Sequence, residues 1–183
     1  MARETKVYTK RGDDGTTGLF FGGRTAKDGD RPTAYGTVDE AQAAIGVARA
    51  HTDDPDLDAL LVATQRDLYV AMAELATLPE NHTKLEDGVS RLTTSMVDRI
   101  EDEIDRVMTM VELPTEFVIP GGNAISAYLD VARTVVRRAE RLSLSLATDE
   151  SVVIPYLNRL SDFLWALARL TEGELTVAST RKA

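Results

Sequence analysis

The chain has 183 residues, a formal net charge of −9 and no cysteine. This length is enough for one domain with a substantial core, and the lack of cysteine excludes disulfide bonds, thiolate metal sites and a cysteine nucleophile. The acidic balance argues against nucleic acid or an anionic membrane as the partner, because both require a broad basic surface.

The N-terminal residues 1–10 are polar and charged, and no apolar run in the chain approaches the length of a membrane span. We therefore expect a protein without a secretory leader or a membrane anchor, located in the cytoplasm. Residues Lys6 to Thr9 are expected to form a short extended piece. Leu19 to Phe21 are expected to form a second strand, which ends at two glycines.

A glycine-rich loop, residues 11–18, separates these two pieces. Its glycines, Gly12 and Gly18 among them, allow backbone N–H groups to close around a phosphate. Lys10 and Lys27 flank the loop and would neutralise such a ligand. No Gly-Lys-Ser/Thr sequence follows, which excludes an ordinary P-loop nucleoside triphosphatase. The loop by itself is equally consistent with a plain hairpin turn.

The rest of the chain shows the helical periodicity of apolar residues. Five helices are predicted, at residues 35–51, 55–78, 90–110, 123–147 and 155–170. Because short loops join them, they are expected to form an antiparallel bundle. The predicted organisation is a single all-α domain over residues 1–183. It consists of an N-terminal phosphate-binding loop region at 1–30, a helical bundle at 34–172 and a frayed tail at 173–183.

The fourth predicted helix carries a stripe of positive charge in an otherwise acidic chain. Arg133, Arg137 and Arg141 follow at intervals of four residues and so share one helix face, with Glu140 beside them. The opposite face is apolar. So much like charge on one stripe indicates an anion or a set of carboxylates opposite it. Carboxylates of neighbouring helices would satisfy the arginines as well as a phosphate ligand would, and the sequence leaves both interpretations open.

Three further residues need to be weighed in the same way. Asp39 lies early in the first predicted helix, where the helix dipole alone favours a carboxylate, although it could instead pair with an arginine such as Arg133. Asn158 could ligate magnesium near a triphosphate or simply cap the last helix. Phe117, in a short apolar segment before the arginine helix, would ordinarily be counted as a core residue. No general acid and base pair and no Ser-His-Asp set stand out in the sequence.

Five motifs in this order resemble the PduO-type ATP:cob(I)alamin adenosyltransferases and span nearly the whole chain. They are Tyr8 to Leu19, Tyr35 to Glu40, Phe117 to Gly122, Ala132 to Arg141 and Asn158 to Leu164. The resemblance implies a ferritin-like five-helix bundle that forms a homotrimer with active sites between neighbouring subunits. It also implies transfer of the 5'-deoxyadenosyl group of ATP to the cobalt of cob(I)alamin, giving adenosylcobalamin and triphosphate. Cob(I)alamin is itself a strong nucleophile, so no catalytic base is required.

The resemblance assigns individual residues to ATP. Arg137 would lie closest to the phosphates that leave, and Asn158 would contact ATP and its Mg²⁺. Lys27 would lie on the phosphates. The other residues expected to bind ATP lie in the N-terminal loop and on the arginine helix, and they are Thr9, Lys10, Arg11, Gly12, Thr17, Gly18, Arg138, Glu140 and Arg141.

Three residues would shape the corrinoid side of the site. Asp39 and Arg133 resemble the family's intersubunit salt bridge. Phe117 resembles the aromatic residue below the corrin ring, where it would keep dimethylbenzimidazole or water away from cobalt. The Co(II) corrinoid would then be four-coordinate, which makes its reduction to Co(I) easier.

Two positions depart from the family pattern. Ala41-Gln42 stands where many members have Leu-Asn, and Trp165 stands where phenylalanine is usual, which is expected to alter packing near the site. The resemblance also implies a reductase and a B12-dependent enzyme that receives the product. Two other functions remain open: a carrier that delivers adenosylcobalamin to such an enzyme, and a structural bundle that does not bind ATP.

Overall fold

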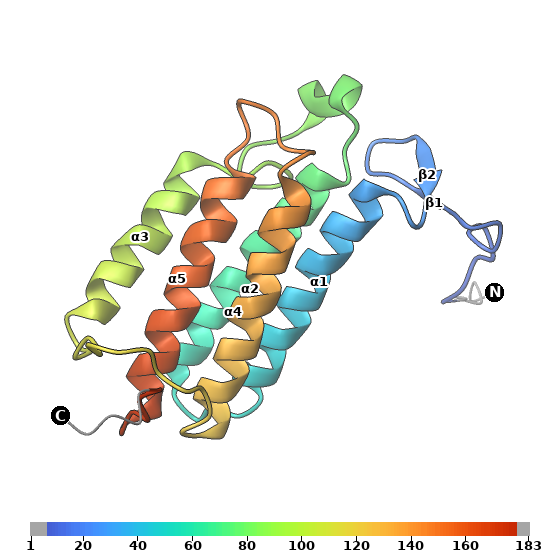
Figure 1. The fold of residues 1–183 in the computed structure, drawn as a ribbon. Helices are drawn as coiled ribbons and strands as arrows, with labels where there is room; N and C mark the ends of the chain where they lie inside the picture. Colours follow the sequence, from blue (N-terminus) through green and yellow to red (C-terminus); the bar gives the residue numbers. More distant parts are fainter. Residues whose placement is uncertain (1–6, 179–183) are drawn as a thin grey trace, which may run out of the picture.

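The computed structural model describes residues 7–178, which contain five α-helices, one 3-10 helix and one two-stranded sheet (Figure 1). The prediction of an all-α fold is confirmed, although the expected count of five helices missed the 3-10 helix. The α-helices are α1 (Asp30–Arg49), α2 (Pro55–Leu75), α3 (Thr94–Met108), α4 (Ala124–Ser143) and α5 (Val153–Glu172). The 3-10 helix is η1 (Pro79–Lys84), and the strands are β1 (Thr16–Gly18) and β2 (Arg24–Ala26).

Two helices begin away from their predicted starts. Helix α1 begins at Asp30, ahead of the predicted start at residue 35, with Pro32 in its first turn. A proline is tolerated there because the first N–H groups of a helix have no partner within it. Helix α3 begins only at Thr94, because residues 86–91 form a turn. In this turn the backbone N–H of Glu86 donates to Ser90 Oγ at 2.9 Å.

Side-chain caps determine where α2 and α4 begin. Asp54 precedes α2, and its carboxylate accepts the backbone N–H groups of Asp56 and Leu57 at 2.9 and 3.3 Å. Asn123 precedes α4 and forms a capping box with Ser126, whose backbone N–H lies 2.8 Å from Asn123 Oδ1. A cap of this kind stabilises a helix by about 1 kcal/mol. The arginine helix therefore starts at a defined residue.

The N-terminal hairpin does not contain the predicted strand at residues 19–21. Strand β1 pairs with β2 in the register Thr16 to Ala26, and residues 19–23 form the turn between them. Phe21 has a φ of 59° and Gly22 a φ of 100°, which a tight turn requires and a strand does not allow. The backbone N–H of Phe20 donates to the carbonyl of Ala76 at 3.0 Å, so the turn is anchored to the end of α2.

One hydrophobic core runs through the bundle. Helix α1 packs against α2 and α4, and α5 packs against α3 and α4. The apolar face of α4 opposite the arginines is buried as predicted, with Leu129, Ala132, Val136 and Ala139 all at 0% exposure. Burial of a large aliphatic side chain stabilises the fold by about 1.5–3 kcal/mol. This face therefore sets the rotation of α4 and directs its arginines away from the core.

The segment that follows α5 is paired, although residues 173–183 were expected to fray. The backbone N–H of Ile119 donates to the carbonyl of Thr176, and that of Ala178 donates to the carbonyl of Phe117, both at 2.7 Å. The prediction is thus wrong for residues 176–178, because a pairing with a segment so distant in the sequence leaves no local signal. Residues 179–183, like residues 1–6 at the other terminus, lie outside the described part of the chain.

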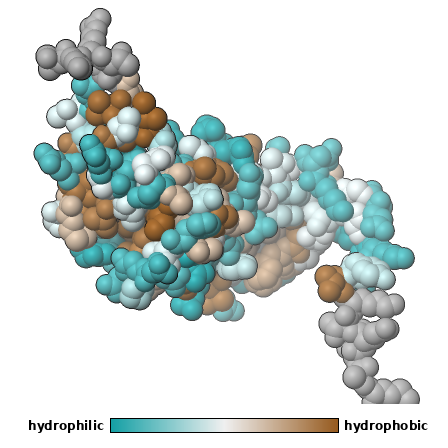
Figure 2. Space-filling model, turned by 90° about the horizontal axis from the view of Figure 1, so that it is seen from below, coloured by the Kyte–Doolittle hydropathy of each residue, from teal (hydrophilic) through white to brown (hydrophobic). Residues whose placement is uncertain are grey.

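The two ends of the bundle differ. The hairpin and η1 lie at the end where α4 finishes, whereas the connection between α3 and α4 lies at the opposite end (Figure 1). Figure 2 looks at the molecule from the latter side and shows hydrophobic patches among hydrophilic ones. Exposed apolar side chains of this end include Leu113, Phe117 and Ile119. Among the helices of residues 7–178, none has the length and apolar character that crossing a membrane requires.

Candidate active site

The arginines of α4 have different partners. Arg137, Arg138 and Arg141 are exposed, and Arg138 forms an ion pair with Glu40 of α1. Within residues 7–178, Arg137 and Arg141 form no ion pair with a carboxylate. The interpretation that the stripe only meets carboxylates of neighbouring helices therefore does not account for these two residues. Two guanidinium groups one helical turn apart repel each other, so this face favours an anionic ligand.

Arg133, at the start of the same stripe, is largely covered. Its Nε lies 2.8 Å from Oδ1 of Asp130, one turn earlier on α4. Asp130 in turn contacts Arg169 of α5 at 2.7 Å. Asp39 is exposed on α1 and forms no ion pair within the described residues. A single chain does not test the predicted contact of Asp39 with Arg133 of another subunit, and that contact stays a prediction.

Asn158 and Glu140 lie side by side on adjacent helices. Asn158 Nδ2 donates to Glu140 Oε1 at 3.2 Å, and Asn158 Oδ1 accepts from Arg159 Nη1 at 2.7 Å. The alternative that Asn158 caps α5 is wrong, because the N-cap position of that helix belongs to Val152. The sequence did not predict this contact, since 18 residues separate the two side chains. It places one amide oxygen and one carboxylate next to the exposed arginines of α4.

The glycine-rich loop is folded against Lys27. A Cβ atom built on Gly12 would lie 3.1 Å from Lys27 Nζ, so the ammonium group rests directly on the glycine. The backbone N–H of Lys27 also donates to the carbonyl of Gly15 at 2.9 Å. The predicted association of Lys27 with this loop is therefore present in the fold. The loop is also continuous with the β1–β2 hairpin, so the hairpin and the glycine loop are parts of one structure.

The loop is braced by two residues that sequence reasoning missed. Arg24 of β2 donates through Nη2 to the carbonyl of Arg11 at 2.8 Å and through Nε to Thr16 Oγ1 at 3.0 Å. Asp14 accepts the backbone N–H of Thr16 at 3.0 Å. This backbone hydrogen bond, with help from the Thr16 hydroxyl, lowers the pKa of Asp14 below its usual range. An aspartate two residues before a threonine is a recognisable turn signal, whereas the Arg24 contacts depend on the hairpin register.

The remaining loop residues that were predicted to bind ATP are at or near the surface. Thr9, Lys10 and Arg11 are exposed, as is Gly18, while Thr17 is half-buried in β1. Lys10 has a φ of 59°, the left-handed region that a non-glycine residue enters mainly in turns. The N-terminal loop is thus an open arrangement of donors next to the start of α1.

Phe117 is not a core residue, so the alternative that its apolar neighbours suggest is wrong. Its side chain is 89% exposed, on the connection between α3 and α4. It lines a cavity of about 440 Å³ together with Trp165 of α5, and the other lining residues are Pro114, Thr115, Glu116 and Val118. An aromatic ring left this exposed next to an apolar hollow indicates a surface that another molecule covers. The apolar residues around Phe117 in the sequence do not distinguish a core position from a surface that another molecule covers.

Comparison with known proteins identifies the family of this chain. The family model described as cobalamin adenosyltransferase matches residues 7–171. The chain belongs to this family. A corrinoid adenosyltransferase of Citrobacter freundii is 42% identical over 170 residues, which cover 91% of this chain and 95% of the relative. A corrinoid adenosyltransferase of Mycobacterium tuberculosis (strain H37Rv) is 46% identical over 180 residues, which cover 93% of this chain and 90% of the relative.

Solved structures of the family have the same fold. A phenylalanine-to-histidine variant of a PduO-type ATP:corrinoid adenosyltransferase from Lactobacillus reuteri, complexed with cobalamin and ATP, superposes with a TM-score of 0.85. It is 29% identical, and the match covers 97% of this chain and 98% of that one. An arginine-to-lysine variant from the same organism, complexed with ATP, has a TM-score of 0.83, 28% identity and coverage of 94% and 100%.

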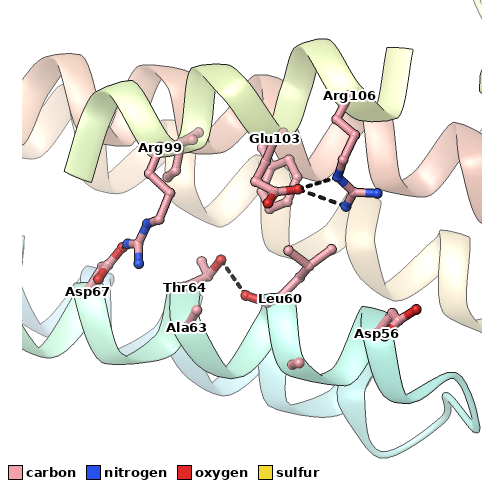
Figure 3. A pocket seen from close by; sticks show the side chains of 11 residues that line it. Asp56, Leu60, Ala63, Thr64, Asp67, Arg99, Glu103 and Arg106 are labelled. Carbon is pink, nitrogen blue, oxygen red and sulfur yellow. Dashed lines mark hydrogen bonds and ion pairs between the residues drawn. The ribbon is translucent and has the colours of Figure 1, made fainter. Parts of the chain in front are cut away.

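A separate cavity of this family member lies between α2 and α3 (Figure 3). Its volume is about 440 Å³, and none of the predicted site residues lines it. Asp67 points toward Arg99 across the groove and accepts the hydroxyl hydrogen of Tyr156 at 2.9 Å. Burial raises the pKa of Asp67 and outweighs the opposing effects of Tyr156 and Arg99. This cavity is therefore no part of the predicted adenosyltransferase site on α1, α4 and the N-terminal loop.

Proposed function

We propose that this chain transfers the 5'-deoxyadenosyl group of ATP to the cobalt of cob(I)alamin. The observation that carries the proposal is the pair of exposed arginines, Arg137 and Arg141, without carboxylate partners in residues 7–178 of a cobalamin adenosyltransferase. A helix face with two uncompensated positive charges suits a triphosphate, which carries several negative charges.

The reaction needs little covalent chemistry from the protein. The electron pair of Co(I) attacks C5' of ATP, the C5'–O bond breaks, and triphosphate leaves with the bonding electrons. The cobalt thereby becomes Co(III), bound to carbon. No proton has to be removed from the nucleophile, which agrees with the absence of an evident base. The contribution of the protein is to position the two substrates and to neutralise the charge that develops on the leaving triphosphate.

The triphosphate would be held from two sides. On one side Arg137 and Arg141 of α4 supply charge, with Arg137 nearest to the bond that breaks. On the other side Lys27 rests on Gly12 of the glycine-rich loop, and its ammonium group would contact the phosphates. Arg138 would contact ATP as well, and its ion pair with Glu40 links α4 to α1 beside the nucleotide.

Mg²⁺ would bind beside the triphosphate. The described residues contain no cluster of three or more His, Cys, Asp or Glu side chains suited to a metal ion. Asn158 Oδ1 and the Glu140 carboxylate are hard oxygen donors on adjacent helices, and Mg²⁺ commonly takes one or two protein ligands together with phosphate oxygens and water. These two residues therefore fit an ion that arrives with ATP, and the ion would supply further neutralisation of the triphosphate.

The corrinoid would lie at the other end of α4. Phe117 is exposed beside an apolar cavity, so its ring is free to lie against the lower face of a corrin and to exclude a base or water from cobalt. The four-coordinate Co(II) that results is reduced more easily. Electrons would come from a reductase, and the product would pass to a B12-dependent enzyme. We propose a cytoplasmic location, where ATP and the reductase would be available.

We also propose a homotrimer of single-domain subunits with a site between neighbours. Asp39 is exposed and without an ion pair in the described part of the chain, while the Arg133 side chain keeps 25% of its surface exposed. A neighbouring subunit that brought these two groups together would complete the site. Sedimentation measurements of Asp39→Asn against wild type, with activity measured on both, would test this contact.

The test of the function is an anaerobic absorbance assay with cob(I)alamin and MgATP. Formation of the cobalt–carbon bond together with release of triphosphate in equal amount supports the proposal. Product release measured with and without a B12-dependent acceptor enzyme tests the carrier alternative. If titration calorimetry shows no binding of MgATP, the bundle is structural.

A further inference from the structure

A chain of buried charges links α4 and α5 at the end of the bundle that carries Phe117. The side chains of Glu172, Arg169 and Asp130 are 1%, 2% and 5% exposed. Arg169 Nη2 lies 2.7 Å from Glu172 Oε2 and 2.7 Å from Asp130 Oδ2. Asp130 Oδ1 lies 2.8 Å from Nε of Arg133, at the surface. Two negative and two positive groups therefore alternate from the core to the predicted active site.

Glu172, at the inner end of this series of charges, holds the turn that follows Phe117. The backbone N–H of Gly122 donates to Glu172 Oε1 at 3.0 Å. A Cβ atom on Gly122 would lie 2.5 Å from Glu172 Cγ, so the contact requires glycine at this position. Asn123 Nδ2 donates to the carbonyl of Thr171 at 2.6 Å, which adds a second bond between the turn and the end of α5.

The other end of the Phe117 segment is held by the residues that follow α5. The backbone N–H of Ala178 donates to the carbonyl of Phe117, and the carbonyl of Thr176 accepts from Ile119. The ring of Phe117 is 89% exposed, so packing in the core does not determine its position. Its position is determined by backbone contacts with residues 171–178 and by the Glu172 carboxylate.

Arg169 contacts the cavity beside Phe117 through the side chain of Trp165. Its guanidinium carbon lies 5.7 Å from the ring centroid of Trp165, within the range of a cation–π interaction. Trp165 and Phe117 line one cavity. Arg169 therefore contacts the wall of the hollow under Phe117, while its partner Glu172 holds the turn. Buried ion pairs often stabilise a fold no better than apolar residues would, so stability alone is a weak reason for this cluster.

We propose that Arg169 and Glu172 are positioning residues that set the Phe117 segment relative to the arginines of α4. Neither side chain reaches a substrate, because both are buried. They act through the Gly122 turn on one side and through Asp130 and Arg133 on the other. The inference rests on the proposed function, since Phe117 and Arg133 are assigned to the corrinoid side of the site.

The test uses the full-length protein with cob(II)alamin and MgATP under anaerobic conditions. Two variants disturb one contact from its two sides: Glu172→Gln removes the charge but keeps the shape, and Gly122→Ala keeps the charge but pushes the turn away. For both we expect the absorbance signature of four-coordinate Co(II) to fall by about fivefold, while the Kd for MgATP, from titration calorimetry, changes by less than about twofold. The matched control is Glu103→Gln, which alters another Glu–Arg pair three residues apart, on α3.

The outcomes separate the inference from the proposed function. A wild-type protein that gives no ATP-dependent signature contradicts the proposed function itself. A wild-type protein that gives the signature, with both variants equal to it, overturns the positioning role. A parallel loss of the signature and of ATP binding in both variants also overturns it, because the effect would then be general disruption. A loss confined to the signature supports it.

Discussion

The polar face of α4 changes character along its length. Near the glycine-rich loop, Arg137 and Arg141 are exposed and have no carboxylate partner in the described residues, so their charge is available to a ligand. One and two turns earlier, the half-buried Arg133 and the buried Asp130 belong to a neutral chain of charges that continues into the core at α5. Arginines at the same spacing therefore have different surroundings. Asp130 of the same helix, itself held by Arg169 of α5, pairs with Arg133, whereas no carboxylate of the described residues pairs with Arg137 or Arg141.

The buried charges that link α4 to α5 should matter most for stability. Arg169→Met leaves the carboxylates of Glu172 and Asp130 in the core without their shared partner. We expect the free energy of unfolding to fall by about 3–5 kcal/mol, because breaking a buried pair leaves uncompensated charge. Urea denaturation followed by circular dichroism measures this. Arg106→Met, on the exposed surface of α3, is the control with an expected loss below about 1 kcal/mol. Equal losses in the two variants would show that the buried charges around Arg169 stabilise the fold no more than an exposed ion pair does.

The exposed half should matter most for turnover. Arg137→Ala removes a charge that the structure leaves free for the leaving triphosphate, and we expect kcat to fall by about 10²–10³-fold. Its free energy of unfolding should stay within about 0.5 kcal/mol of wild type, because the side chain is exposed. Steady-state kinetics and urea denaturation of the same preparation test both statements. Activity close to wild type would contradict the assignment of Arg137 to ATP.

Phe117 tests whether the corrinoid lies at the buried half of α4. Phe117→Ala should reduce the ATP-dependent four-coordinate Co(II) signature and lower kcat by about tenfold, with KM for ATP nearly unchanged. Stability should be unaffected because the ring is 89% exposed. Substitution of Leu113, another exposed apolar residue of this end, by alanine is the control. An unchanged signature in Phe117→Ala would remove Phe117 from the site.

The ion pair of Asp67 and Arg99 lies between the buried and the exposed cases, because its side-chain exposures are 8% and 49%. Burial raises the folded-state pKa of Asp67 above the ordinary value of 3.8, so the folded protein binds more protons than the unfolded chain just above that pH. Stability contributed by this group therefore falls as pH rises from 3.8 through the folded-state pKa. Asp67→Asn should remove this decline and change neutral-pH stability by less than about 1 kcal/mol.

Thermal unfolding midpoints measured from pH 3.8 to neutral pH test this, with Asp56→Asn, an exposed residue of the same cavity, as the matched control. A decline that is as steep in Asp67→Asn as in wild type would assign the pH dependence to other groups.

The errors of prediction share one cause. The core alternative for Phe117, the strand at residues 19–21 and the frayed tail were all judged from apolar or polar character over a few residues. In the structure each depends on a distant contact: Phe20 with Ala76, Phe117 with Ala178, and the turn after Phe117 with Glu172. Helix periodicity in contrast repeats every few residues, so α1 to α5 were found and only their ends were misplaced.

The sequence by itself determined the helices, the arginine spacing on α4, the apolar face behind it and the five motifs that resemble the family. These are local properties, because the helix period and the composition of a motif need no partner. Only the tertiary structure decided that Asp130 meets Arg169, that Asn158 meets Glu140 and that Lys27 rests on Gly12. Contacts between separate elements depend on how the core rotates each helix, and no local pattern of residues records that rotation.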